Sequence, residues 1–237
     1  MIEVRRADDR GVIERHWLSS RHTFSFGHYF DPKQVGFSDL LAINDDRVIG
    51  GRGFEHHAHR DVDIFSYILE GALQHKDTLG NDVTIKSGEV QMMNAGTGIA
   101  HSELNPSSTE GVHFLQIWIQ PERSGALPRY QNAQFPQTGK RGKLKLVISP
   151  DGRDGSVSTY QDVRAYAGLF HGAEAGVLEL PNDRYAYVHV ARGAVSINGC
   201  SLRDGDGARV RKETRLVVSD GSDSEILIFD LRPHETP

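Results

Sequence analysis

Two short clusters of metal-binding side chains stand out in this sequence. His57 and His59 are separated by one residue, and so are His101 and Glu103. In a β-strand, residues at positions i and i+2 point to the same face and lie ~7 Å apart along the strand. Two such strands facing each other would direct three imidazoles and one carboxylate to a common point. This set suits a divalent transition metal with open coordination positions, and open positions allow a reaction.

The elements that must position these side chains are predicted to be β-strands. Short β-branched and aromatic runs recur between Gly, Asn, Asp and Pro, and long helical periodicity is scarce. The predicted strands include 63–69, 111–119, 143–148, 185–190 and 225–231, with turns such as 79–82 and 198–199 between them. An all-β fold follows.

A faint internal repeat indicates two similar β-barrels. The matching segments come in the same order, and they pair 67–73 with 188–195, 87–90 with 204–207, and 115–121 with 227–233. Segment 120–142 is rich in Pro, Gly and polar residues, so it is the predicted linker. We therefore expect an N-terminal domain at residues 1–130 and a C-terminal domain at 143–237.

The two halves differ in chemistry. Nine of the twelve histidines precede residue 114. Where the second half corresponds to His57 and His59, the sequence has Glu179 and Pro181, and proline has no side-chain ligand atom. We expect the metal site in the first barrel, and a structural or regulatory second barrel without a metal site.

Composition excludes several classes of protein. The net charge is −5, so the chain has no surplus of basic residues that would indicate nucleic-acid binding. Cys200 is the single cysteine, which excludes an intramolecular disulfide framework and a multi-cysteine zinc site. No stretch approaches the ~20 apolar residues of a membrane span. The charged N-terminal segment 1–10 lacks the apolar run of a signal peptide, so we expect a cytoplasmic protein without membrane association.

The spacing of these residues resembles a known family. The patterns Gly51-(x5)-His57-x-His59-(x3)-Asp63 and Gly98-(x2)-His101-(x3)-Asn105 resemble the two cupin motifs. More specific strings resemble the pirin family, and these are 24–26, 53–69, 96–103 and 149–152. The resemblance extends from about residue 17 to the end of the chain and is densest between 17 and 121.

The pirin resemblance implies a bicupin, which is a tandem pair of double-stranded β-helix (jelly-roll) barrels. It implies one metal ion in the first barrel, Fe²⁺ first and Zn, Co, Ni, Mn or Cu as alternatives, held by His57, His59, His101 and Glu103. Several bacterial pirin-like proteins cleave the flavonol quercetin with O₂ and release CO. The expected function is therefore a quercetin 2,3-dioxygenase-type reaction with a flavonol and O₂ as substrates, in which Glu103 accepts the proton of the flavonol 3-hydroxyl.

Two other functions remain open. Vertebrate pirin is an iron-dependent transcriptional coregulator, so this chain could be a regulatory or interaction protein without a dedicated catalytic role. A cupin oxygenase acting on another enolic small molecule is the other alternative. Direct nucleic-acid binding is not expected, and the sequence indicates no particular protein partner.

Two further residues are candidates for supporting roles. Many cupins draw a carboxylate ligand from a Glu shortly after the His-x-His pair, whereas Asp63 stands there and is one methylene shorter. We expect Asp63 to support the metal ligands or to be structural. His75 follows Gly71 on the next strand, and it either orients a ligand imidazole or is a polar residue near a turn.

Overall fold

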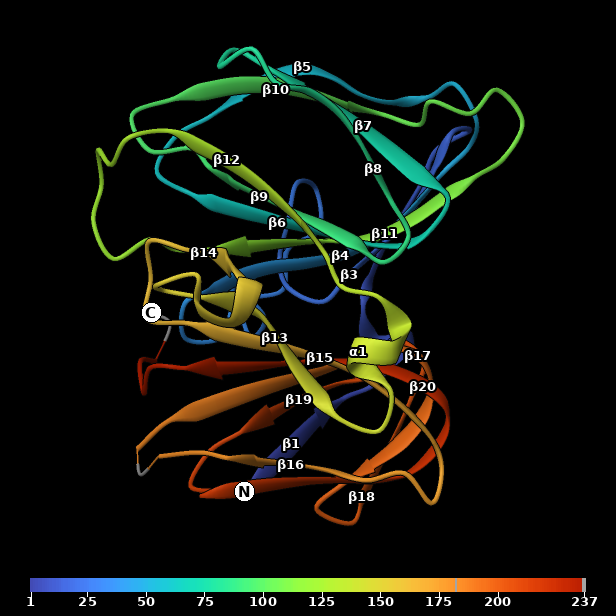
Figure 1. Ribbon diagram of the computed structural model, residues 1–237, viewed down its shortest axis with the longest axis vertical. Helices are drawn as coiled ribbons and strands as arrows, with labels where there is room; N and C mark the ends of the chain where they lie inside the picture. The colour runs from blue at the N-terminus through green and yellow to red at the C-terminus, as the bar shows by residue number, and fades with distance from the viewer. Residues whose placement is uncertain (182, 236–237) are drawn as a thin grey trace.

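β-Strands form most of the chain, and they build two barrels stacked along its longest axis (Figure 1). The structure is a computed structural model that describes residues 1–181 and 183–235. Within these residues, helical structure is confined to α1 (Gln137–Lys140) and to the 3-10 turns Ala7–Asp9 and Arg153–Gly155. The predicted all-β bicupin fold is confirmed.

The first barrel consists of two antiparallel sheets. The larger sheet has the strand order β12 (Arg129–Gln134), β9 (Glu89–Asn94), β6 (Asp63–Glu70), β11 (Val112–Ile119), β4 (Leu40–Val48), β3 (Leu18–His22) and β2 (Gly11–Glu14). The smaller sheet has the order β5 (Gly53–His59), β10 (Ile99–Leu104), β7 (Ala72–Asp77) and β8 (Asp82–Lys86). The small sheet lies at the end of the molecule farthest from the second barrel (Figure 1).

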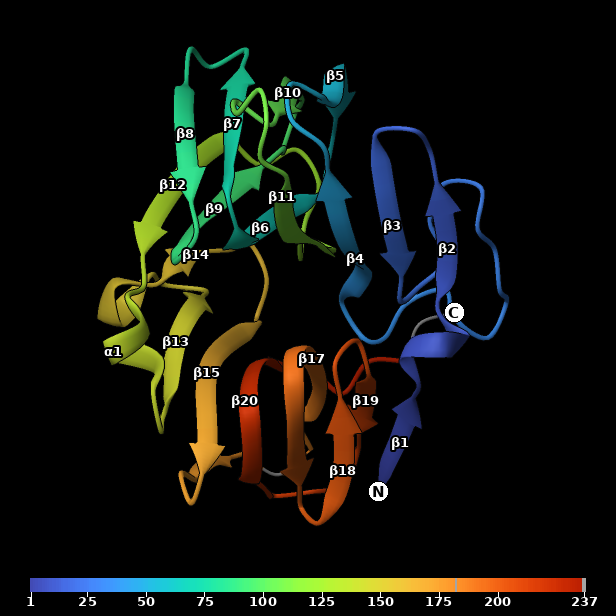
Figure 2. The same cartoon turned by 90° about the vertical axis from the view of Figure 1, so that its right-hand side faces the viewer.

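The second barrel is built from one continuous hydrogen-bonded sheet. Its order is β1 (Ile2–Arg5), β19 (Gly207–Val210), β17 (Tyr185–Ile197), β20 (Arg215–Leu231), β15 (Arg164–Gly172), β13 (Leu144–Ser149) and β14 (Val157–Ser158), with β16 (Gly176–Glu179) on β20 and β18 (Cys200–Arg203) on β17. The first strand of the chain thus belongs to the second barrel, beside β19 (Figure 2).

Strand pairing supports the internal repeat. β6 pairs with β9 and β11 in the first barrel, and β17 pairs with β19 and β20 in the second. The matching segments lie in these strands or begin in the turns that precede β9 and β19. The predicted linker is more ordered than expected, because β12 extends the first barrel past residue 130 by pairing with β9. The domain limits themselves stay a prediction.

The apolar strands are buried on both faces because the barrels pack against each other. In β6, Phe65 and Tyr67 contribute to the core between the barrels, whereas Ile64 and Ile68 point into the first barrel. β17 is likewise covered on both faces, and its Val188 and Val190 belong to the continuous apolar interior of the second barrel. A strand covered on both faces needs a nearly unbroken apolar sequence.

The interior of the first barrel is not uniformly apolar. Apolar clusters fill its two ends, one around Phe114 and the other around Ile64 and Met93. Between them the described buried polar side chains include Ser66, His75, Gln91, His101, Glu103 and Gln116. This polar belt is where the chemistry predicted from the sequence would take place.

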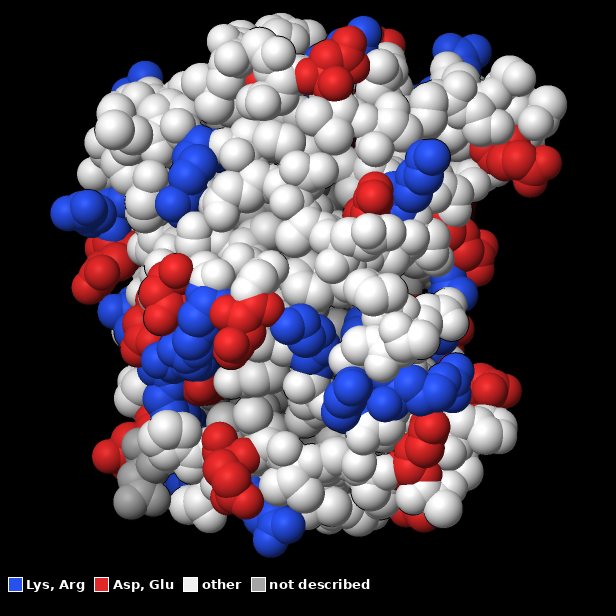
Figure 3. All heavy atoms as spheres, in the orientation of Figure 1, with Lys and Arg blue, Asp and Glu red and all other residues white. Residues whose placement is uncertain are grey.

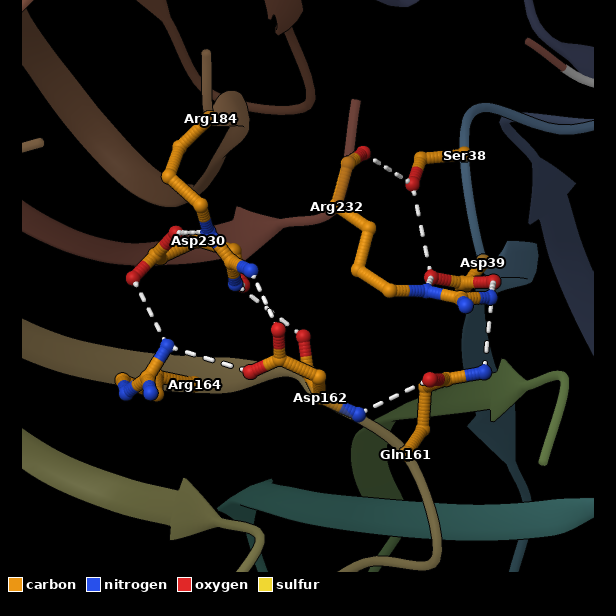
Figure 4. A network of polar contacts seen from close by, with 8 residues as sticks. All are labelled: Ser38, Asp39, Gln161, Asp162, Arg164, Arg184, Asp230 and Arg232. Atoms are coloured by element: carbon orange, nitrogen blue, oxygen red, sulfur yellow. Dashed lines mark hydrogen bonds and ion pairs between the residues drawn. The ribbon is translucent and has the colours of Figure 1, made fainter. Parts of the chain in front are cut away.

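A polar network links the barrels at the end of β20 (Figure 4). Arg232 makes two hydrogen bonds to the carboxylate of Asp39, at 2.9 and 2.7 Å, and Gln161 adds a third at 3.3 Å. On the other side of the network, Arg184 lies 2.6 Å from both Asp162 and Asp230. The Arg232–Asp39 pair joins the two barrels, whereas Arg184, Asp162 and Asp230 all belong to the second barrel.

Charged side chains of both signs are interspersed on the surface shown in Figure 3. Exposed ion pairs such as Lys76–Asp82 fit this intermixed pattern. In the part of the chain that the structure describes, no helix has the length and apolar character needed to cross a membrane.

Candidate metal centre and adjoining cavity

Three imidazoles converge inside the first barrel. β5 and β10 pair in an antiparallel register that places His57 opposite His101, and His59 follows on the same face. The ring centroids are 4.7 Å apart for His57–His59, 4.6 Å for His57–His101 and 5.0 Å for His59–His101. One nitrogen from each ring lies within 4.8 Å of the others, so the three rings can share one metal ion.

The hydrogen bonds of these rings leave nitrogens available for a metal. The Nδ1 of His57 lies 2.7 Å from the carbonyl oxygen of Glu55, which leaves its Nε2 free. The Nε2 of His101 is buried and has no hydrogen-bond partner among the described residues. Since buried polar atoms are almost always paired, this unpaired nitrogen fits a site that a metal ion completes.

Glu103 lies next to the imidazoles on the inward face of β10. The pairing of β10 with β5 shifts by one residue between His101 and Glu103, which sets Glu103 against Phe54. The side chains of His101 and Glu103 both remain buried despite this bulge. Gly53 is required beside it, because a Cβ there would collide with the carbonyl oxygen of Glu103. The expected parity of the two residues on β10 is thus observed.

The carboxylate of Glu103 is held by three donors. Its Oε1 accepts hydrogen bonds from Gln91 at 2.6 Å and Ser66 at 3.3 Å, and its Oε2 accepts one from Gln116 at 2.6 Å. A carboxylate oxygen can accept two bonds, so Oε2 keeps one free lone pair. One carboxylate oxygen of Glu103 and one ring nitrogen each of His101 and His75 lie within 4.8 Å of one another. Because His101 belongs to both groups, Glu103 adjoins the three-imidazole cluster.

His75 is fully buried behind His101. Its Nε2 lies 2.9 Å from the carboxylate of Asp77, and its Nδ1 lies 3.4 Å from the Nδ1 of His101. Its ring stacks on Tyr130 at 4.5 Å. The Asp77 carboxylate accepts a hydrogen bond from the Nε2–H of His75, so the Nδ1 of His75 is left as an acceptor for the Nδ1–H of His101. Such a contact fixes the tautomer in which the Nε2 of His101 carries the lone pair.

Burial controls the protonation of the cluster. It lowers the pKa of His59 to about 4, and the nearby charge of His57 acts in the same direction. It lowers the pKa of His101 to about 2, again with a contribution from His57. Burial also raises the pKa of Glu103. His59 and His101 are therefore neutral near pH 7, which is the form that binds metal ions.

Asp63 does not join the cluster. Its Oδ2 accepts hydrogen bonds from the Thr159 hydroxyl at 2.8 Å and the Tyr160 backbone N–H at 2.7 Å, both from the second half of the chain. Its side chain thus links the barrels, and these contacts favour the structural alternative. Asp63 does not share a face with His59, because β5 ends at His59 and a turn with Asp61 at φ 51° leads the chain into the other sheet.

A cavity of about 570 Å³ adjoins the three imidazoles. This volume falls within the range of ~300–1,000 Å³ typical of small-molecule sites. Near the cluster Trp118 meets His59 edge to face at 5.0 Å, and elsewhere in the lining Trp17 meets Phe54 at 5.4 Å. The lining also includes the polar residues Ser20, His22, Asn44, Asp46 and Gln116.

Asn44 and Asp46 were not among the predicted site residues, although a signal for them exists. They are polar residues at i and i+2 in the otherwise mostly apolar stretch that forms β4. The intervening Asp45 points to the other face, where it pairs with His113 at 2.7 Å. The spacing that identified the His-x-His pair thus applies to this strand too.

Two stacked barrels with an inward-facing imidazole cluster in the first define a bicupin. The Pirin family profile matches residues 3–119, and the profile of the quercetinase C-terminal cupin domain matches residues 146–231. The chain belongs to the pirin family.

Full-length relatives support this assignment. The quercetin 2,3-dioxygenase of Escherichia coli K12 is 45% identical over 233 residues, covering 98% of this chain and 100% of the relative. The crystal structure of the bacterial pirin YhhW from E. coli in complex with nickel(II) has a TM-score of 0.94 and 44% identity, and the match covers 99% of this chain and 100% of that one. YhaK from E. coli, at 30% identity and a TM-score of 0.74, covers 88% and 92%.

Proposed function

We propose that this protein is a metal-dependent dioxygenase that cleaves flavonols such as quercetin with O₂ and releases CO. The observation that carries the proposal is the aromatic-lined cavity beside three convergent imidazoles, one of which has a buried, unpaired Nε2. The similarity to a quercetin 2,3-dioxygenase over nearly the whole chain supports it. A site enclosed in a barrel suits a small molecule better than a protein partner, so we favour the enzyme over the regulatory alternative.

The proposed metal ligands are His57, His59 and His101, with Glu103 as a fourth through the free lone pair of its Oε2. All are nitrogen and oxygen donors, a set that most first-row divalent ions accept. Fe²⁺ remains the predicted native ion, and the nickel complex of YhhW makes Ni²⁺ the first alternative to test. The cytoplasmic location also stays a prediction.

The bound ion would supply a Lewis acid that favours the deprotonated 3-hydroxyl of a flavonol and gives access to dioxygen chemistry. The protein's own contribution is to orient the substrate and to move one proton. The rings of Trp118 and Phe26, 4.9 Å apart, provide an apolar surface for a planar aromatic ligand. Glu103 is the proposed acceptor of the hydroxyl proton, at the Oε2 lone pair that it would otherwise share with the metal ion, and the amides of Gln91 and Gln116 hold that carboxylate in place.

The direct test measures quercetin absorbance and CO release together. Metal-free protein is reconstituted separately with Fe, Co, Ni, Mn, Cu and Zn, and elemental analysis of freshly purified protein identifies the native ion. We expect loss of the quercetin band with CO release for at least one metal, and none for metal-free protein or for His101→Ala. Absence of turnover with every metal would overturn the proposal.

A further inference from the structure

The hydrogen-bonded row that holds Glu103 continues sideways into the cavity. Cross-strand neighbours in the large sheet pair Gln91 with Ser66, Ser66 with Gln116, Gln116 with Asn44, and Asn44 with His22. Directly opposed side chains in a sheet have Cβ atoms only ~4.5–5.5 Å apart, so this is a continuous polar row. Its inner members Gln91, Ser66 and Gln116 bind Glu103, and Gln116, Asn44 and His22 line the cavity.

A second polar pair lies beside the outer end of this row. Ser20 is opposite Asp46 in the register of β3 and β4, and both line the cavity. Ser20 is 1% exposed, and Asn44 and Asp46 are each 2% exposed. These three residues come from two neighbouring strands and form one polar area of the cavity wall.

Three polar atoms of this area have no hydrogen-bond partner among the described residues. The Ser20 Oγ, the Asn44 Oδ1 and the Asp46 Oδ1 are all buried without a hydrogen-bond partner within residues 1–181 and 183–235. An unsatisfied buried polar group destabilises the fold, and native proteins rarely tolerate several together. The Asn44 and Asp46 oxygens can accept hydrogen bonds and the Ser20 hydroxyl can accept or donate one, so a ligand that carries hydroxyl groups can pair with all three.

Aromatic rings define the rest of the ligand's chemistry. Both tryptophans of the chain line the cavity, Trp118 against His59 and Trp17 against Phe54. These side chains fit flat rings, and the unpaired acceptors fit hydroxyl groups. Phenolic hydroxyls on a planar ring combine the two.

We propose that Ser20, Asn44 and Asp46 form a subsite that binds phenolic hydroxyls of the substrate remote from the hydroxyl at the metal, and so selects polyhydroxylated flavonols. This inference rests on the proposed function, because it takes the cavity as the substrate site. The subsite acts in recognition, and no proton transfer is assigned to it. A flavonol lacking the remote hydroxyls leaves the three acceptors unpaired and binds more weakly.

Two compounds and their dissociation constants test the proposal. Quercetin carries remote phenolic hydroxyls, whereas 3-hydroxyflavone keeps only the 3-hydroxyl and the neighbouring carbonyl. Binding is followed without oxygen in nickel-loaded protein by quenching of Trp17 and Trp118, which both line the cavity. We expect the wild type to bind quercetin at least tenfold more tightly than 3-hydroxyflavone, since one unmet hydrogen bond corresponds to about tenfold.

The variants Asn44→Leu and Asp46→Leu should each reduce that preference by about tenfold, mainly by weakening quercetin binding. The matched control is Asp82→Leu, which removes an exposed carboxylate of the same barrel away from the cavity and should keep the wild-type preference. Asp46→Ala, which also removes the acceptor oxygen, replaces Asp46→Leu if the latter fails to fold, as judged by its melting temperature and metal content.

The outcomes separate the subsite from the proposed reaction. A wild type without the preference, or variants that weaken both compounds equally or leave the ratio unchanged, would overturn the subsite. Normal quercetin turnover with an unchanged ratio in the variants contradicts the subsite alone. The expected preference and its loss in the variants, without turnover by any metal form, support the subsite and contradict the dioxygenase.

Discussion

His75 and His101 face each other through their Nδ1 atoms, 3.4 Å apart, and Asp77 holds the far side of His75 at 2.9 Å. This arrangement orients a proposed metal ligand from behind. We predict that His75→Phe, which keeps the stacking on Tyr130 but removes both hydrogen bonds, lowers metal affinity by about 10- to 100-fold. Competition with a chelating dye measures the affinity.

The control for this prediction is Lys76→Ala, an exposed neighbour on the same strand. It should bind metal like the wild type. The melting temperature of metal-free His75→Phe checks that the barrel is intact. Unchanged affinity in an intact barrel would show that His75 fills space and does not orient His101.

Glu103→Gln tests the proposed proton acceptor. The three imidazoles remain, so we expect metal stoichiometry to be kept. The amide cannot accept a proton as a carboxylate does, and its NH₂ group would meet the donors that Glu103 now binds. We predict a fall in kcat of about 100-fold or more. Steady-state turnover of quercetin with parallel metal analysis measures both, and Ser102→Ala on the outward face of β10 is the control. Full activity in Glu103→Gln would exclude it as the base.

Asp63 is predicted to stabilise the contact between the barrels. Asp63→Ala leaves the Thr159 hydroxyl and the Tyr160 N–H buried without their acceptor, so we expect the free energy of unfolding to fall by about 2–3 kcal/mol. Asp63→Asn keeps an acceptor oxygen and should lose less. Urea unfolding measures the change, and metal stoichiometry should stay the same. A loss of metal with unchanged stability would instead place Asp63 in support of the metal site.

These residues also show how far the sequence could predict the molecule. The apolar runs of β6, β11 and β20 and the parity of His101 and Glu103 are local patterns, and the structure matches them. Asp63 could not be placed, because counting parity from His59 fails once the chain turns into another sheet. The pairing of β1 with β19 is a contact between opposite ends of the chain, about which local sequence carries no information. β12 is a polar edge strand without apolar alternation, so it resembled a linker.

His189 provides a prediction about pH and stability. It is fully buried on β17, and neither ring nitrogen has a hydrogen-bond partner in the described chain. Burial lowers its pKa to about 3, with Arg10 and His113 acting in the same direction and Asp45 and Asp206 opposing them. Between about pH 3 and pH 6.5 the unfolded chain therefore binds a proton that the folded chain does not, so stability is lost as the pH falls. The free energy of unfolding falls by about 1.4 kcal/mol for each pH unit between 6.5 and about 3.

The variant His189→Phe, which cannot titrate, should lose this part of the pH dependence. Metal-free protein is used, because metal binding is itself coupled to protonation. We expect the free energy of unfolding in urea, measured from pH 6 to pH 4.5, to fall less steeply in the variant, by about 1.4 kcal/mol per pH unit. The other buried histidines titrate in both proteins, so the difference between the two slopes isolates His189. His234→Phe removes an exposed histidine and should retain the wild-type slope. Parallel slopes for His189→Phe and the wild type would mean that His189 is protonated, or exposed to water, in the folded protein.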